Sequence, residues 1–318
     1  MLEKSISISS YNCNSAKKSV DVIRELIDTH DIVCLQETFI NESESNFISG
    51  LYKDINFCIS GSTCKGDFSG GRPKGGLIII WKQALNKIIN PVIFHENYIG
   101  IKINGLNQDH LLINTYLPYE NNTNEQLISY REIIASLSRE IENYEGFSIE
   151  IIGDLNADPK PTRFWNEIHD FCSRYSFYVA DSILPQDSFT FLSACHDTVS
   201  WLDHVLVSNP DDVLRTSILY DICIDDHFPL SIEMKFDKPD KIAEKCSVDP
   251  NKFINWNRFN MHKQEIEGLL ENHFNLECLK NDLFYRTTAD CNKAGHQKLI
   301  DEFYACLLEG LIRFIRDA

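Results

Sequence analysis

The chain has 318 residues, of which 43% are hydrophobic and 24% are charged. This balance is ordinary for a globular protein, and it excludes a wholly disordered chain, a collagen-like repeat and a disulfide miniprotein. The formal net charge of −17 argues against broad affinity for nucleic-acid duplexes, whose protein partners usually present a basic surface. A nuclease that contacts phosphate through a metal ion stays compatible with this charge.

The cysteines and the N-terminus bear on the compartment. The 11 cysteines are scattered and include no Cys-x-x-Cys pair, so they predict buried, reduced thiols rather than a disulfide framework or a zinc ribbon. The N-terminal MLEKSISIS has no apolar signal-peptide core, and the longest apolar stretch, residues 77–81, is far shorter than a membrane helix. We therefore expect an intracellular protein, nuclear or cytoplasmic, that is not secreted and has no membrane partner.

Short strand-like and helix-like runs alternate up to about residue 236. Period-two alternation and short apolar runs predict strands at 5–9, 31–35, 76–81, 111–116, 148–152, 177–180, 188–192, 202–208, 217–223 and 230–235. Apolar residues at helical spacing predict helices at 19–28, 124–144 and 163–175. Many strands with few helices predict an α/β fold in which two sheets pack face to face with helices outside.

The pattern changes after this region. Residues 239–249 are polar and predict a linker, which makes residues 1–238 one domain. Residues 250–318 are predicted to be helical, because apolar side chains recur at helical spacing in 261–274 and 299–315. Helices this amphipathic usually pack on another surface.

Six segments place acidic, amide, histidine or tyrosine side chains at the ends of predicted strands. They are 11–14 (YNCN), 35–38 (LQET), 114–116 (NTY), 153–156 (GDLN), 200–204 (SWLDH) and 225–229 (DDHFP). Each alone is more often a turn, a cap or a solvated pair. Six such segments, all at strand ends, where distant parts of a chain converge, instead indicate one functional surface.

These residue types permit a specific chemistry. Carboxylate and amide oxygens without thiolates suit Mg²⁺, and also Mn²⁺. A histidine beside a carboxylate holds a protonated imidazole against phosphate, a tyrosine hydroxyl adds a donor, and an aspartate near an asparagine orients water. Together they predict metal-assisted, in-line hydrolysis of a phosphoester.

In this order, the segments resemble the endonuclease/exonuclease/phosphatase superfamily, which includes DNase I and repair nucleases of the exonuclease III type. The most specific parts are GDLNADP, SWLDHVLVS and DDHFPL. The resemblance implies a DNase I-like four-layer α/β sandwich, with two packed mixed sheets flanked by helices, followed here by a C-terminal helical appendage. The loop in SGGRPKGGLIIIW, residues 69–81, is most similar to the endonuclease domain of LINE-type non-LTR retrotransposons.

The resemblance also implies the catalytic residues. Asp154 corresponds to the residue that activates the attacking water, and Asn156 to the one that orients the water or the phosphate. His227 corresponds to the phosphate-binding histidine, held by Asp203. Tyr116 corresponds to a tyrosine that contacts phosphate.

Metal and DNA contacts are implied in the same way. Glu37 resembles the principal Mg²⁺ ligand, with Asn12 and Asp226 near the metal. The residues expected to contact DNA are Thr190 and Asn14, by resemblance, and Arg72 and Lys74, which rim a glycine-rich turn. The alternative interpretation is that this turn is only a flexible connection and makes no contact with DNA. Residues 191–200 are expected to form a hairpin that probes DNA grooves.

The leading hypothesis is a Mg²⁺-dependent endonuclease that nicks target-site duplex DNA for a retrotransposon. The chain carries no reverse-transcriptase signature, so a reverse transcriptase of the same polyprotein would be a partner encoded elsewhere. The alternatives are an abasic-site or exonuclease III-like repair nuclease, another phosphodiesterase of this fold, and an inactive, domesticated interaction module. Trp201, at a position often basic in relatives, and the acidic composition depart from the nuclease pattern.

Overall fold

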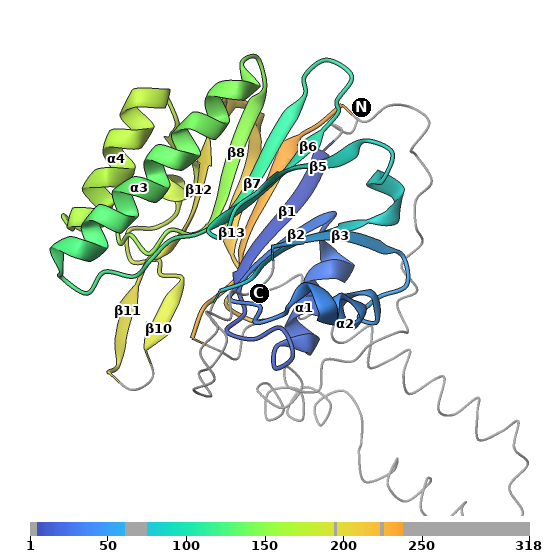
Figure 1. Cartoon of the computed structure of the whole chain (residues 1–318), viewed down its shortest axis with the longest axis horizontal. Coiled ribbons are helices and arrows are strands. Elements are labelled where there is room, and N and C mark those ends of the chain that lie inside the picture. Colours follow the sequence, from blue (N-terminus) through green and yellow to red (C-terminus); the bar gives the residue numbers. More distant parts are fainter. Residues whose placement is uncertain (1–4, 61–74, 194–195, 223–225, 238–318) are drawn as a thin grey trace, which may run out of the picture. The chain divides into compact units, whose positions relative to one another are not determined.

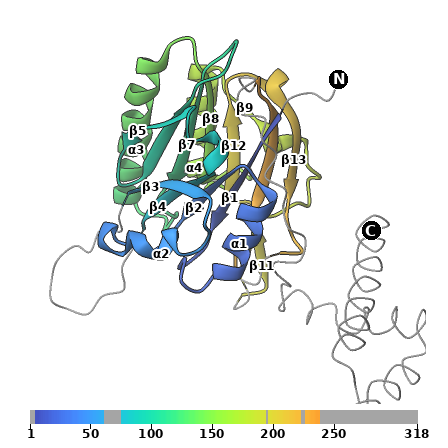
Figure 2. The same ribbon diagram turned by 90° about the vertical axis from the view of Figure 1, so that its right-hand side faces the viewer.

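The computed structural model describes residues 5–60, 75–193, 196–222 and 226–237. Within these ranges, two six-stranded sheets pack face to face with helices on their outer faces (Figures 1 and 2). Both sheets contain parallel and antiparallel pairs. The predicted four-layer α/β sandwich is confirmed.

The first sheet has the strand order β13-β14-β1-β2-β4-β3. Its strands are β1 (Ser5–Asn12), β2 (Ile32–Gln36), β3 (Ile55–Ser60), β4 (Leu77–Lys82), β13 (Val213–Ile218) and β14 (Leu230–Lys235). Helices α1 (Val20–Thr29) and α2 (Ser45–Ser49) contribute to the core on its outer face. Helix α1 packs there because its buried residues fall on one helical face.

The second sheet has the order β5-β6-β7-β8-β12-β9. Its strands are β5 (Ile89–Phe94), β6 (Tyr98–Ile103), β7 (His110–Tyr116), β8 (Ser148–Asp154), β9 (Tyr178–Val179) and β12 (Asp203–Val207). Helices α3 (Asn124–Ile141) and α4 (Arg163–Tyr175) cover its outer face. Thr123 and Thr162 cap these helices, each accepting a backbone N–H of the first turn.

The central core lies between the sheets. Strand β4 shows how the sequence builds it: Leu77, Ile79 and Trp81 join the core between the sheets, whereas Ile78 and Ile80 join the core beneath α1. Because side chains alternate along a strand, a continuous apolar run is what a strand buried on both faces requires.

Short elements complete the described fold. The 3₁₀ helices are η1 (Glu42–Glu44), η2 (Gln83–Leu85), η3 (Glu142–Tyr144), η4 (Ala180–Ile183) and η5 (Pro210–Asp212). A separate antiparallel hairpin of β10 (Phe191–Ser193) and β11 (Thr198–Ser200) extends beyond the sandwich, as Figure 1 shows. This hairpin lies where residues 191–200 were expected to form one.

Several sequence predictions need correction. Elements α2, β3, β5 and β6 were not predicted. The strand predicted at 217–223 is β13, which begins and ends earlier in the chain. The strand predicted at 188–192 is β10, which begins later, at Phe191. The helix predicted at 124–144 ends at Ile141 and continues as a 3₁₀ turn. The linker at 239–249 and the helical segment at 250–318 lie outside the described residues. In the described part of the chain, no helix is long and apolar enough to cross a membrane.

The strand register brings polar side chains to one edge of the sandwich. Parallel pairing of β1 with β2 sets Asn12 beside Gln36. In the other sheet, Tyr116 is paired with Asp154, and Asp154 with Asp203. We call this edge, formed by the loops after β1, β2, β7 and β8 and those before β12 and β14, the site edge.

Candidate active site

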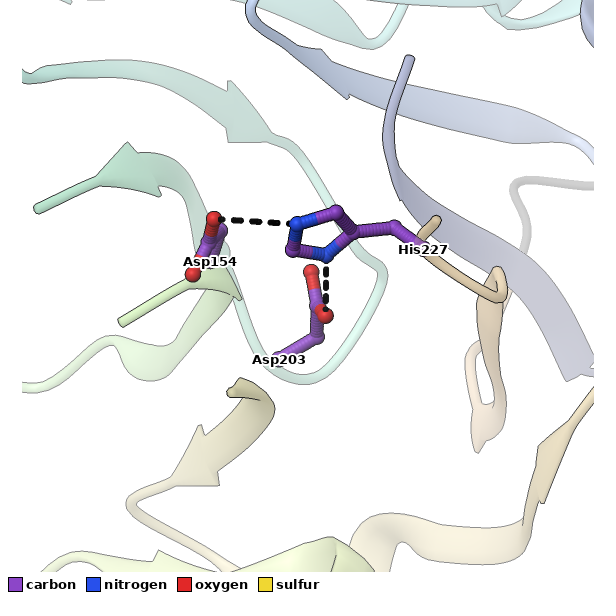
Figure 3. Close-up of side chains that lie close together, drawn as sticks. All are labelled: Asp154, Asp203 and His227. Carbon is purple, nitrogen blue, oxygen red and sulfur yellow. Dashed lines mark hydrogen bonds and ion pairs between the residues drawn. The ribbon is translucent and has the colours of Figure 1, made fainter. Parts of the chain in front are cut away.

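Asp154, Asp203 and His227 form the centre of the site edge (Figure 3). The Nδ1 atom of His227 lies 2.9 Å from Oδ2 of Asp203, and its Nε2 atom lies 3.9 Å from Oδ2 of Asp154. All three side chains are buried. The imidazole therefore lies between two carboxylates that come from neighbouring strands of the second sheet.

The surroundings of His227 favour its protonated form. Burial alone would lower the pKa of His227, but the charge and hydrogen bond of Asp203, with the charges of Asp154 and Glu37, raise that pKa to about 9. The three side chains lie close enough to hold a metal ion. An imidazolium has no lone pair to offer, however, so we interpret this group as a charged hydrogen-bonding relay.

Asp154 is held by two donors. Its Oδ1 atom accepts the backbone N–H of Asn156 at 2.9 Å, and its Oδ2 atom accepts Nδ2 of Asn12 at 2.9 Å. Burial and the charge of Asp203 raise the pKa of Asp154 to about 7, against the opposing effect of His227. A carboxylate of this kind is a stronger base than a solvated aspartate, as the activation of water requires.

Glu37, Tyr116 and Asn12 form the adjoining part of the site. Oε1 of Glu37 accepts the hydroxyl of Tyr116 at 2.8 Å and Nδ2 of Asn12 at 3.1 Å. Burial and the charges of Glu37 and Asp154 raise the pKa of Tyr116 above its usual value, which keeps the hydroxyl protonated as a donor. Asn12 thus bridges the carboxylates of Glu37 and Asp154, and its own Oδ1 accepts the N–H of Asn14 at 3.2 Å.

Backbone conformation sets several of these residues apart. Glu37, Asn156 and Asn14 have φ angles of 48°, 50° and 41°, in the left-handed region that residues other than glycine rarely adopt. Such conformations persist only where the surroundings enforce them, and they gather at functional sites. Asn156 is further fixed by its Nδ2, which donates to the carbonyl of Leu117 at 2.8 Å.

The donor set fits a divalent cation. Glu37, Asp154 and Asp203 supply three carboxylates against one imidazolium, and Oδ1 of Asp203 is buried without a hydrogen-bond partner among the described residues. Hard oxygen ligands and excess negative charge suit Mg²⁺ or Mn²⁺. Glu37 is the half-buried carboxylate best placed to hold the ion, with Asn12 beside it.

The remaining predicted site residues differ in where they lie. Asp226 is exposed beside His227, and its backbone carbonyl accepts the N–H of Leu192 at 2.7 Å. Asn14 is half-buried at the site edge. Arg72 and Lys74 lie outside the described residues.

Thr190, which was expected to contact DNA, has a structural role in the described fold. Its side chain is fully buried. Its hydroxyl accepts the N–H groups of Leu202 and Asp203 at 3.0 and 2.9 Å, and its carbonyl accepts the N–H of Phe228 at 2.7 Å. Thr190 therefore ties the start of β12 to the segment that carries His227.

Buried amides link the two sheets below the site, and sequence reasoning gave them no role. Nε2 of Gln36 donates to Oδ1 of Asn114 at 2.6 Å, and Asn114 donates to the carbonyls of Leu35 and Ile78. The signal was present, because both residues lie within two of the six polar segments. Their place in buried strands marks them as structural links rather than surface groups.

A second buried pair, Asp181 with His204, was also missed. Asp181 accepts Nδ1 of His204 at 2.8 Å and the N–H of Val205 at 2.8 Å, while Nε2 of His204 lies 2.8 Å from the carbonyl of Ala157. His204 thus connects β12 to the segment that follows Asp154. Asp181 lies in a short 3₁₀ helix with no pattern that would predict this contact.

Comparison with known proteins agrees with this geometry. Residues 9–227 match the model of the Endonuclease/Exonuclease/phosphatase family. No curated protein matches the chain in sequence. Because the family match covers more than half of the chain, it shows membership and not only likeness.

Solved structures share the fold at low sequence identity. An AP endonuclease from Leishmania major has a TM-score of 0.62 and 15% identity, covering 74% of this chain and 89% of that one. The 3′ phosphatase NExo from Neisseria has a TM-score of 0.55 and 13% identity, covering 73% of this chain and all (100%) of that one. The endonuclease domain of TRAS1, a telomere-specific non-LTR retrotransposon, has a TM-score of 0.54 and 13% identity, covering 74% and 100%.

These likenesses show the fold, and they do not single out the retrotransposon group, because AP endonucleases and a phosphatase score at least as highly. The superfamily resemblance drawn from the sequence is confirmed. With its two-sheet fold, its acidic edge and the family match over residues 9–227, the chain belongs to the Endonuclease/Exonuclease/phosphatase family.

Proposed function

We propose that this domain is a Mg²⁺-dependent endonuclease that nicks DNA by in-line attack of water on a phosphodiester. The observation that carries the proposal is the buried group of Asp154, Asp203 and His227 beside Glu37 and Tyr116. This group combines a base, a proton donor and excess negative charge. Metal-assisted hydrolysis of a phosphodiester uses all three features, because the negative charge holds the cation.

Each residue has a role that follows from its contacts. Asp154 accepts a proton from the attacking water, and Asn156, fixed against Leu117, orients that water. His227 donates Nε2–H to a phosphate oxygen, while Asp203 holds the ring by Nδ1. Tyr116 presents its hydroxyl as a second donor near Glu37. Glu37, with Asn12 and Asp226 near it, would hold a divalent cation, which when bound would supply Lewis-acid stabilisation of the phosphate charge.

The proposed setting is target-site nicking by a non-LTR retrotransposon, in which the 3′-hydroxyl primes a reverse transcriptase encoded in the same polyprotein. Similarity of fold to the TRAS1 endonuclease domain supports this setting. The β10–β11 hairpin next to His227 is the element we expect to enter a DNA groove, since Phe191 is bridged to His227. The fold also matches an AP endonuclease, which makes abasic-site cleavage the second candidate.

The test is relaxation of a supercoiled plasmid by the full chain, with Mg²⁺, with Mn²⁺ and with EDTA. We expect nicking that needs the metal and falls by about a hundredfold or more in Asp154→Ala, the loss typical of one catalytic group. Asp158→Ala is the matched control, because Asp158 follows the same strand but pairs with Lys160 at 2.9 Å.

Parallel assays with an abasic oligonucleotide and a 3′-phosphorylated oligonucleotide separate the candidate substrates. Efficient cleavage of the abasic site alone would favour the repair-type enzyme over the proposed nickase. Nicking that persists in EDTA or in Asp154→Ala would contradict the proposal.

A further inference from the structure

The site edge carries exposed aromatic side chains. Among the residues that the structure describes, the phenylalanines and tyrosines classed as exposed are Phe94, Tyr119, Tyr178 and Tyr220. Phe94 is the last residue of β5 and is paired with Ile99, near the start of β6 and the end of β7. Tyr119 follows β7, and Tyr220 follows β13. Tyr178 is paired with Val207, at the end of β12 away from Asp203, so it lies far from this edge.

Tyr119 lies on a loop that the site itself holds. Its side chain is 61% exposed, three residues after Tyr116. The loop is fixed where it begins, since the N–H of Leu117 donates to the carbonyl of Asp154 at 2.9 Å, and Asn156 donates to the carbonyl of Leu117. The loop that carries this exposed ring therefore starts beside Asp154, the proposed base.

Tyr220 lies after β13 and packs on Phe228, the residue that follows His227 in the chain. Its ring is 41% exposed, yet its hydroxyl accepts the N–H of Phe189 at 3.1 Å. The ring centroids of Phe189 and Phe228 are each 5.2 Å from that of Tyr220. Phe228 directly follows His227, so these contacts pre-organise an exposed aromatic ring on the segment that carries the proposed proton donor.

Three cations among the described residues near this edge are paired with acids. Lys17 lies 2.6 Å from Glu44, Lys160 lies 2.9 Å from Asp158, and Arg163 lies 2.8 Å from Glu120. Duplex binding normally relies on unpaired Lys and Arg that neutralise phosphates. In a chain of net charge −17, these three paired cations offer little of that attraction. Stacking of bases on aromatic rings does not depend on charge in this way.

We propose that Tyr119 and Tyr220 stack on unpaired nucleobases on the two sides of the scissile phosphodiester. The preferred substrate is then DNA whose bases are unpaired at the cleavage point, such as a single strand or a bubble, because the bases of an intact duplex already stack on one another. This inference rests on the proposed function and names the substrate class for the same site.

The test compares a single strand, a bubble and an intact duplex of one sequence as substrates of the full chain. We expect the single strand and the bubble to be cleaved with higher kcat/KM. Tyr119→Ala and Tyr220→Ala should each raise KM for these substrates about five- to a hundredfold, the range for losing one stacked base, with little change in kcat. Tyr119→Phe should restore KM, because phenylalanine keeps the stacking face, and Tyr178→Ala is the matched control.

A binding assay separates this inference from the proposed function. Asp154→Asn protein is titrated with a labelled single strand and with the labelled duplex. Tighter binding of the single strand, weakened by Tyr119→Ala but not by Tyr178→Ala, supports the inference even if the wild type hydrolyses nothing. Equal binding of both DNAs would overturn the inference, and so would equal effects of Tyr119→Ala and Tyr178→Ala on binding. Binding to phosphatidylcholine vesicles is measured in parallel. If Tyr119→Ala weakens vesicle binding but not DNA binding, the inference is also overturned.

Discussion

At the scale of single residues, the site depends on two groups with opposed requirements. In the proposed mechanism, Asp154 must be ionised to take a proton from water, and His227 must be protonated to donate one to phosphate. Burial works against both charged forms. Asp203 supports His227 but raises the pKa of Asp154, so one carboxylate adjusts both groups.

We expect a bell-shaped dependence of kcat/KM on pH. Activity should fall as pH drops through the pKa of Asp154, raised to about 7, because the base becomes protonated. It should fall again as pH rises through the pKa of His227, raised to about 9, because the donor loses its proton. A bound cation near Glu37 would move both limbs toward lower pH.

The variant Asp203→Asn tests the cause of these shifts. It removes the negative charge that raises both pKa values, so both limbs of the profile should move to lower pH, with a lower maximum. The measurement is the nicking rate across pH at constant ionic strength, for wild type and variant. An alkaline limb that stays in place would show that Asp203 does not support the charge of His227.

The sequence anticipated most of the residues that meet at the site, because each lies at or next to the end of an apolar strand. Asp154, Asp203, His227, Glu37, Tyr116 and Asn12 all lie at one edge. Burial shows a structural role that the motif did not indicate: the hydroxyl of Thr190, expected to contact DNA, holds the backbone of Asp203. Asp181 could not be found, because it lies in a short 3₁₀ helix outside the six polar segments.

At the scale of elements, the parallel pair β7–β8 positions Tyr116 beside Asp154. Gly153 makes this pairing possible. Its φ angle is +148°, and a Cβ atom there would lie 2.0 Å from the carbonyl oxygen of Thr115. A side chain at this position would force the two strands apart directly below the proposed base.

Gly153→Ala should therefore lower the free energy of unfolding by about 3 kcal/mol or more, combining backbone strain with steric overlap. Gly146→Ala is the matched control: Gly146 also has a positive φ angle, but nothing lies near its added Cβ atom, so about 1 kcal/mol is expected. Urea denaturation measures both. Equal losses would mean that the close approach to Thr115 carries no cost.

The elements that the sequence did not predict have physical reasons. Strand β5 contains Pro91, and its buried and exposed residues alternate poorly. The reason is that β5 lies at a sheet edge with much of its length exposed. Strand β3 is the other sheet's edge and is mostly half-buried. Central strands such as β4 and β8 were predicted because burial on both faces leaves a continuous apolar run.

At the scale of the whole molecule, the site exists only because two sheets pack together. Asn12 and Glu37 follow strands of the first sheet, and His227 precedes another of its strands. Asp154 and Asp203 belong to the second sheet. The contacts between Asn12 and Asp154, at 2.9 Å, and between Gln36 and Asn114, at 2.6 Å, join the sheets at the site edge.

A double-mutant cycle between Asp154 and His227, which come from different sheets, tests most directly whether these side chains act on one phosphodiester. The measurement is the Mg²⁺-dependent plasmid nicking rate of wild type, Asp154→Asn, His227→Gln and the double variant. We predict that each single change lowers the rate by about a hundredfold or more, and that the double variant is little slower than the slower single one, because residues that act as a unit are not additive. Losses that multiply in the double variant, or full nicking by either single variant, would contradict the account.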